Sequence, residues 1–223
     1  FESCNKLSTL NVSNFDTSKV INMHSMFDGC VLLSTLNVSN FNTSNVEDFR
    51  AMFWRVSGIT SLDLSSFDTS KATDMQFMFA HCTALKTVNL SSFNTSNVIV
   101  MQQMFIDCPS LEELDLSSFD MTKVTSVSDM FTDCTALTRI VIPQNIQSSY
   151  PITLPTGKTW YLGGFAETDV TTLSGNTYYT GYKCTEVLAY IPETTLDADW
   201  RSQLENAGVT VTSTTTMLFG SPE

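Results

Sequence analysis

The cysteines are the residues whose spacing most suggests chemistry, because thiolates bind metals, form disulfides and act as nucleophiles. Five of the six cysteines share one position in a 26-residue spacing, and Val56 fills the remaining place. The column consists of Cys4, Cys30, Val56, Cys82, Cys108 and Cys134. Side chains stacked in a column have parallel Cβ vectors, whereas a disulfide needs Cβ atoms that converge to about 3.8 Å. We therefore expect five reduced, buried thiols, while the state of Cys184, outside the column, stays open.

Other arrangements that support catalysis or cofactor binding do not occur in the sequence. A metal site needs ligands that converge from several directions, and the two histidines occupy different positions of the spacing. The nine glycines form neither a GxGxxG nor a GxxxxGK[ST] motif. We predict that the chain is not an enzyme and carries no cofactor and no metal.

A column of carboxylates offers a calcium site as the alternative to a structural role. It alternates Asp and Asn, and the position three residues later alternates Lys and Asn. The two columns are Asp16, Asn42, Asp68, Asn94 and Asp120, and Lys19, Asn45, Lys71, Asn97 and Lys123. Alternation keeps like charges about 10 Å apart instead of about 5 Å. Because a Lys follows each Asp of the column three residues later, the pattern favours a structural role of these carboxylates over calcium binding.

A 26-residue repeat must position these columns. Phenylalanine recurs at this step in two columns, which are Phe15, Phe41, Phe67, Phe93 and Phe119, and Phe27, Phe53, Phe79, Phe105 and Phe131. Each coil also contains an LxxLxL segment whose alternation predicts a short strand, and stacked coils would join these strands into a parallel sheet. The residues Val20, Met23, Met26 and Phe27 have spacings of three and four, typical of a short helix that Asp16, Thr17 or Ser18 would cap.

The sequence therefore predicts an α/β repeat solenoid of five 26-residue coils over residues 1–142, with a parallel sheet on one side and short helices on the other. From residue 143 the repeat stops, and residues 143–223 predict a β-rich cap that covers the end of the stack. One amphipathic helix within 194–208 is expected there. The aromatic residues of the cap predict packing, with a sugar-stacking platform as the alternative: Trp160, Tyr161, Tyr178, Tyr179 and Tyr182.

The charge of the chain excludes some partners. With 11 basic and 23 acidic residues the net charge is −12, so nucleic acid and anionic membranes would repel the surface. No run of 18 apolar residues and no leader is seen, so we predict no membrane insertion in this fragment. We also predict that the chain is a monomer.

Units such as MFAHCTALKTVNLSSFNTSNV and MFIDCPSLEELDLSSFDMTKV resemble the 26-residue repeat of bacterial BspA-like leucine-rich surface proteins, over residues 4–142. The resemblance implies a leucine-rich-repeat-like solenoid, secreted or displayed on a cell surface, that acts as an adhesin for a host or bacterial surface protein. Phenylalanine stands where leucine-rich repeats often carry an Asn ladder, so other groups must pair the backbone there. The candidates form the column Ser13, Ser39, Ser65, Ser91 and Ser117.

One coil breaks the pattern, because MFWRVSGITSL places Trp54 and Arg55 where its neighbour has Asp28 and Gly29. Stacking in register would bring Arg55 close to His81 and form an aromatic and basic spot, a composition typical of interface anchors. The alternatives are that Trp54 only packs over the altered turn, and that the partner binds the strand face carrying Glu113 and Asp115. For the whole chain, the sequence predicts a protein-binding module, with a carbohydrate-binding module or a structural spacer as alternatives.

Overall fold

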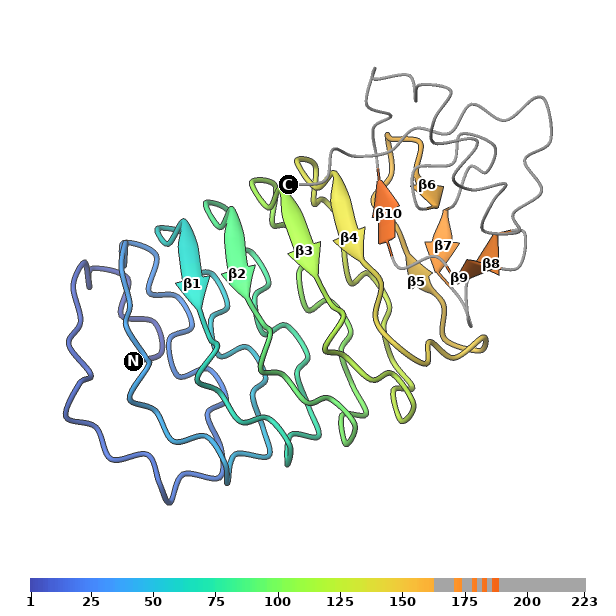
Figure 1. The fold of residues 1–223 in the computed structure, drawn as a ribbon. Coiled ribbons are helices and arrows are strands. Elements are labelled where there is room, and N and C mark those ends of the chain that lie inside the picture. The colour runs from blue at the N-terminus through green and yellow to red at the C-terminus, as the bar shows by residue number, and fades with distance from the viewer. Residues whose placement is uncertain (163–170, 174–177, 180–181, 184–185, 189–223) are drawn as a thin grey trace, which may run out of the picture.

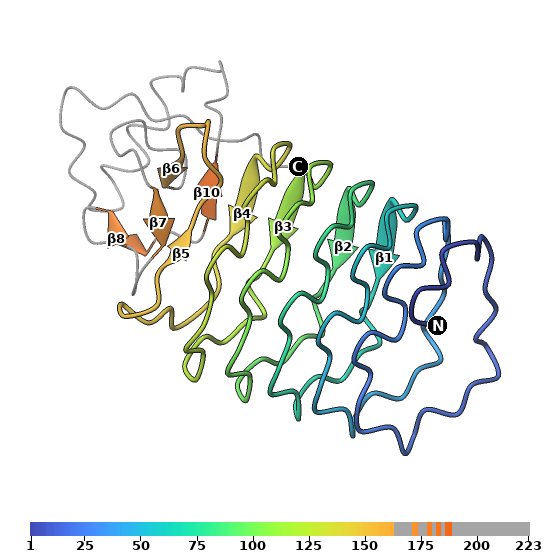
Figure 2. The same cartoon turned by 180° about the vertical axis from the view of Figure 1, so that it is seen from behind.

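The computed structural model describes residues 1–162, 171–173, 178–179, 182–183 and 186–188. The coils lie side by side along one axis, with the N-terminus at one end of the stack and the non-repeating strands at the other (Figure 1). The view from behind shows the same order of coils (Figure 2). Residues 26 apart therefore become neighbours, as the isolated parallel bridges Asn22–Asp48 and Asp48–Asp74 illustrate.

Four short strands come from the expected LxL segments: β1 (Ser61–Asp63), β2 (Thr87–Asn89), β3 (Glu113–Asp115) and β4 (Arg139–Val141). β1 pairs with β2, and β3 with β4, in parallel and shifted by one repeat. The central residue of each strand points inward, while its neighbours are exposed or partly exposed. The predicted parallel pairing of these strands is confirmed, but they form two separate short sheets and not one continuous sheet along the stack. The equivalent segments of the two earlier coils, around residues 10–12 and 36–38, are not strands.

The return arm contains turns, so the prediction of short helices is wrong for the residues that the structure describes. The backbone N–H groups of Met23 and Phe27 donate across the stack, to the carbonyls of Asp48 and Met52. The intervening N–H of Met26 bonds three residues back, to Met23. Every second donor is thus used by the next coil, and no i to i−4 ladder forms. Successive turns bury residues three apart, which is why the apolar spacing resembled that of a helix.

Two positions of each coil have left-handed backbone. Ser25 has φ 54° and Gly29 has φ 71°, and the equivalent residues of the following coils also have positive φ. Such a residue interrupts a right-handed helix. The turns of the return arm are therefore a property of the repeat and recur from coil to coil.

A column of buried threonines links the coils where the helix caps were expected. The Thr69 hydroxyl donates to the carbonyl of Asn94 at 3.0 Å and accepts from the N–H of the same residue at 2.8 Å. Thr17, Thr43 and Thr95 make the same pair of bonds to Asn42, Asp68 and Asp120. These side chains pair the backbone of the next coil as a strand neighbour would.

The expected serine column does not perform this task. The N–H of Ser39 bonds to the Asn37 side chain of its own coil, at 3.0 Å. The next column does reach the preceding coil, as Ser92 does through hydrogen bonds to the carbonyls of Leu64 and Phe67. The backbone pairing predicted for the serine column thus lies one residue further along the chain.

Phenylalanine rings stack through the centre of the coils. Phe27, Phe53, Phe79, Phe105 and Phe131 are buried, and consecutive rings of this column lie 5.2–6.0 Å apart. Each ring is covered on both sides only when a coil is present above and below it. Burial of the core therefore depends on stacking.

Short strands follow the repeat: β5 (Ile152–Thr153), β6 (Tyr161–Leu162), β7 (Thr172–Leu173), β8 (Tyr178–Tyr179), β9 (Tyr182–Lys183) and β10 (Glu186–Leu188). β10 pairs antiparallel with β4 and with β6, so it covers the edge that the last coil would otherwise expose (Figure 1). Trp160 is 1% exposed, and its indole donates to the carbonyl of Pro155 at 3.0 Å. It packs in the core and cannot join a sugar-stacking platform. The helix expected within 194–208 and Cys184 lie outside the described residues.

Candidate binding site

Trp54 lies at the centre of a small group of aromatic and charged side chains on two adjacent coils. Its ring stacks on Phe77 of the next coil, with centroids 5.6 Å apart and planes 16° apart. The ring of His81 lies 6.3 Å away and is tilted. The Arg55 guanidinium carbon lies 4.4 Å above the Trp54 ring centroid, which is a cation–π contact. The prediction that Trp54, Arg55 and His81 lie together in space is consistent with this geometry.

His81 connects this group to a further coil. Its Nδ1 lies 2.8 Å from a carboxylate oxygen of Asp107, and both side chains are partly exposed. We call Trp54, Arg55, Phe77, His81 and Asp107 the Trp54 cluster. Arg55 and His81 have φ values of 57° and 59°, because they occupy the left-handed position that Gly29 fills in an earlier coil.

One buried polar group of the Trp54 cluster lacks a partner in the part of the chain that the structure describes, and burial shifts the pKa of a carboxyl group in the preceding coil. Within the described residues, the buried Nε1 of Trp54 has no hydrogen-bond acceptor. An unpaired buried donor costs about 1–3 kcal/mol. Asp28, one coil earlier, is nearly buried, and this burial raises the pKa of its carboxyl while the charge of Arg55 opposes the rise.

The alternative surface is separate from the Trp54 cluster. Glu113 and Asp115 are the exposed ends of β3. Arg139 of β4 forms an ion pair with Glu113 at 3.3 Å, and the Asp115 carboxylate accepts from the N–H of Ser117 at 2.8 Å. Both carboxylates already have partners within the chain, so this face offers fewer unpaired groups than the Trp54 cluster.

The alternating Asp, Asn and Lys columns have structural partners. The Lys71 ammonium donates to the Asn45 side-chain carbonyl at 2.6 Å, and the Asn45 amide donates to the carbonyl of Ser18 at 2.9 Å. The Asp16 carboxylate accepts from the N–H and hydroxyl of Ser18, and these bonds lower the pKa of Asp16. Each carboxylate thus closes a turn in its own coil. No group of three potential metal ligands occurs in the part of the chain that the structure describes.

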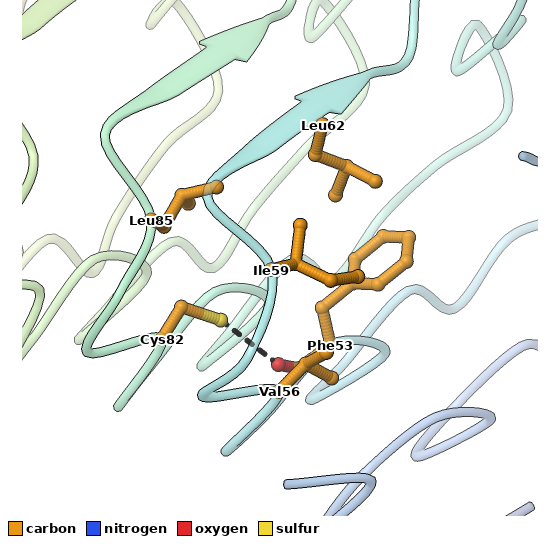
Figure 3. Close-up of a pocket in the computed structure, with 6 residues that line it drawn as sticks. All are labelled: Phe53, Val56, Ile59, Leu62, Cys82 and Leu85. Carbon is orange, nitrogen blue, oxygen red and sulfur yellow. Dashed lines mark hydrogen bonds between the residues drawn. The ribbon is translucent and has the colours of Figure 1, made fainter. Parts of the chain in front are cut away.

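The cysteine column is buried except at its N-terminal end. Cys30, Cys82, Cys108 and Cys134 are buried as expected, whereas Cys4 is exposed and the prediction for it is wrong. Cys4 belongs to the first described coil, and no described residue covers it from the N-terminal side. Each buried thiol donates to a phenylalanine carbonyl 29 residues earlier, as Cys82 does to Phe53 at 3.0 Å (Figure 3).

Val56, the exception in this column, borders a small apolar cavity. The cavity measures about 10 Å³ and is lined by Phe53, Val56, Ile59, Leu62, Cys82 and Leu85 (Figure 3). This volume suffices for about one water molecule, and an apolar lining offers that water no partner. The cavity is therefore a packing defect and not a ligand site.

Burial should make four of the column thiols, all except that of Cys4, unreactive in the native protein. Burial raises the pKa of Cys82 and of Cys134 to about 12, and raises that of Cys108 strongly. The nucleophilic thiolate is then scarce at pH 8. We expect iodoacetamide at pH 8 to label Cys4 at least about tenfold faster than the four buried cysteines, measured by peptide mass spectrometry. Unfolding in guanidinium should equalise the rates, and fast native labelling of Cys82 would contradict the burial.

The structural roles of the threonine column and of Phe77 were not predicted from the sequence. The threonine column has the same 26-residue step as the phenylalanines, so the repeat itself could have identified it. Phe77 is the only aromatic residue at its repeat position, shared with Ser25, Ala51, Gln103 and Asp129. Its contact with Trp54 could be found only once the register and backbone of the turns were known.

The residues that the structure describes contain no helix long and apolar enough to span a membrane. Neither the search of curated proteins nor the search of solved structures found a match. One family model matches the chain twice, over residues 1–88 and 57–150, and together these matches cover about two thirds of it. The overlap of the two matches agrees with the internal repeat. The chain belongs to the family described as Mycoplasma protein of unknown function, DUF285.

Proposed function

We propose that this chain is a non-enzymatic binding module of a secreted or cell-surface protein, of the BspA-like leucine-rich class, and that its ligand is a protein. The resemblance of its repeat units supports the class and the extracellular location. A stack of coils supports a binding role, because it presents a long, rigid surface on which side chains vary while the core repeats. A host or bacterial surface protein is the proposed partner.

The observation that carries the proposal is the position of Trp54. It stands where one coil departs from the repeat, it is half-buried, and its ring contacts Phe77 and Arg55. Tryptophan and arginine are enriched among the residues that dominate binding energy in protein interfaces. Elsewhere the repeat places mainly small hydroxyl, amide and carboxylate side chains on the sheet surface, as on β1 and β2.

The test compares Trp54→Ala with the parent chain on a panel of extracellular-matrix and bacterial surface proteins, with a glycan array beside it. We expect the affinity for the protein that binds best to fall about 30-fold, because a central interface anchor contributes about 2 kcal/mol or more. Surface plasmon resonance measures the affinity, and chemical denaturation measures the stability of each variant.

Two controls separate binding from folding. Trp54→Phe keeps an aromatic ring against Phe77 and should preserve most of the stability. Glu113→Gln changes the alternative sheet surface and should leave the affinity within about twofold. Lost stability at unchanged affinity would assign Trp54 a purely structural role, and a panel without a protein binder would contradict the proposed function. Binding to glycans alone would favour the carbohydrate alternative.

A further inference from the structure

Arg55 differs from the other arginines that the structure describes. The Arg50 guanidinium lies 3.0 Å from Asp48 and 3.5 Å from Asp74, and Arg139 forms an ion pair with Glu113. Within the described residues the guanidinium of Arg55 has no hydrogen bond and no ion pair; it contacts the Trp54 ring. An exposed guanidinium has five N–H donors in a planar fork, and all of these remain available.

The fork is held in position although it has no acceptor. Its contact with Trp54 is supported in turn by the stacking of Trp54 on Phe77. An arginine that is already ordered loses less conformational entropy when a ligand binds than a freely moving one. This is an arrangement suited to recognition of a planar anion by two parallel hydrogen bonds.

We infer that the Trp54 cluster recognises a carboxylate side chain of a partner protein, held by Arg55, with a neighbouring apolar side chain of the partner against Trp54. The inference rests on the proposed function and specifies its ligand chemistry. A carboxylate matches the arginine fork in shape and carries one negative charge. The partly exposed rings of Trp54 and Phe77 supply the apolar contact beside it.

The surrounding charges favour a carboxylate over a phosphate. Asp28 lies close enough to Arg55 for its charge to interact with it, and Asp107 is held by His81. The net charge of the chain is −12. A phosphate with nearly two negative charges meets stronger repulsion from these carboxylates than a carboxylate does, while a single unpaired guanidinium compensates one charge.

The unpaired indole of Trp54 gives a second indication of a missing acceptor. Its Nε1 is buried and has no acceptor within the described residues. Buried donors in folded proteins are almost always paired. Rearrangement around a bound peptide would allow a ligand oxygen to satisfy this N–H, which makes its NMR resonance a local reporter of occupancy.

The experiment uses two blocked pentapeptides of sequence ALELA and ALQLA, which differ only in charge, and inorganic phosphate as a third probe. Titrations are followed by the indole N–H resonance of Trp54 and the Nε–H resonance of Arg55. We expect saturable shifts with the acidic peptide, and at least about tenfold weaker binding of the amide peptide, since hydrogen bonds to a charged group are stronger than those to a neutral one. Equal binding of both peptides, or tighter binding of phosphate, would overturn the inference.

A matched pair of variants controls for net charge. Arg55→Gln and Lys19→Gln each remove one positive charge, and Lys19 is an exposed residue of the first coil. We expect Arg55→Gln to weaken binding of the acidic peptide at least about tenfold, and Lys19→Gln to change it less than about twofold. Equal effects of the two variants would show that only long-range charge acts.

The same variants distinguish failure of this inference from failure of the proposed function. If a panel protein requires Trp54 but tolerates Arg55→Gln, the binding function stands and carboxylate recognition is wrong. If no panel protein binds, the proposed function is wrong, and the peptide titrations still report separately whether Arg55 binds carboxylates.

Discussion

Phe79→Ala is expected to lower the free energy of unfolding by about 4 kcal/mol, the range for a large ring removed from a well-packed core. Phe79 is fully buried between two other rings of its column. Its centroid lies 5.6 Å from that of Phe53 and 5.2 Å from that of Phe105, with nearly parallel planes. Alanine would remove both stacking contacts, and the rigid 26-residue spacing limits how far the neighbouring coils can close the gap.

Guanidinium denaturation followed by circular dichroism measures this loss. A second probe is needed, because repeat stacks can lose two-state behaviour. Phe1→Ala provides the control, since Phe1 occupies the same column at the end of the stack and is 39% exposed. We expect it to cost less than about 1 kcal/mol. A similar loss in both variants would mean that the central ring does not depend on neighbours on both sides.

Thr69→Val is expected to lower the free energy of unfolding by about 3 kcal/mol, although the side chain keeps its shape. The Thr69 hydroxyl bonds to both the carbonyl and the N–H of Asn94, and Thr69 is 0% exposed. Valine would leave both backbone groups of the next coil without this partner. Each unsatisfied buried group costs about 1–3 kcal/mol.

Two other variants test whether loss of the buried Thr69 hydroxyl causes the destabilisation. Thr69→Ser keeps the oxygen and should recover more than half of the loss, with a small cost for the missing methyl. Thr73→Val removes a hydroxyl that bonds to the carbonyl of Glu47 at 3.2 Å on the exposed surface, where water can replace it. That change should cost less than about 0.5 kcal/mol. Equal stability of Thr69→Val and the parent chain would contradict a structural role for the threonine column.

Part of the Trp54 cluster can be predicted from residue types and the repeat alone. The departure of Trp54 and Arg55 from the repeat, and the register that brings His81 close, are visible in the sequence. The direction of the Arg55 side chain is not, because its left-handed backbone and its contact with the Trp54 ring arise only in the folded turn. The same 26-residue step places Asp107 beside His81, but only the structure shows that the His81 Nδ1 and the Asp107 carboxylate lie 2.8 Å apart.

The sequence by itself determined the 26-residue step, the strands of the four later LxL segments and the burial of the column from Phe27 to Phe131, because these follow from apolar periodicity and from the need of each coil for neighbours. Only the tertiary structure decided that the return arm forms turns. Apolar residues three positions apart are compatible with both a helix and successive turns. Which of the two forms depends on whether the backbone N–H groups bond within the coil or to the next coil. Met23 and Phe27 bond to the next coil, as does the hydroxyl of Thr69. The stacking that completes the core thus also supplies the hydrogen bonds that a helix would have supplied within a single coil.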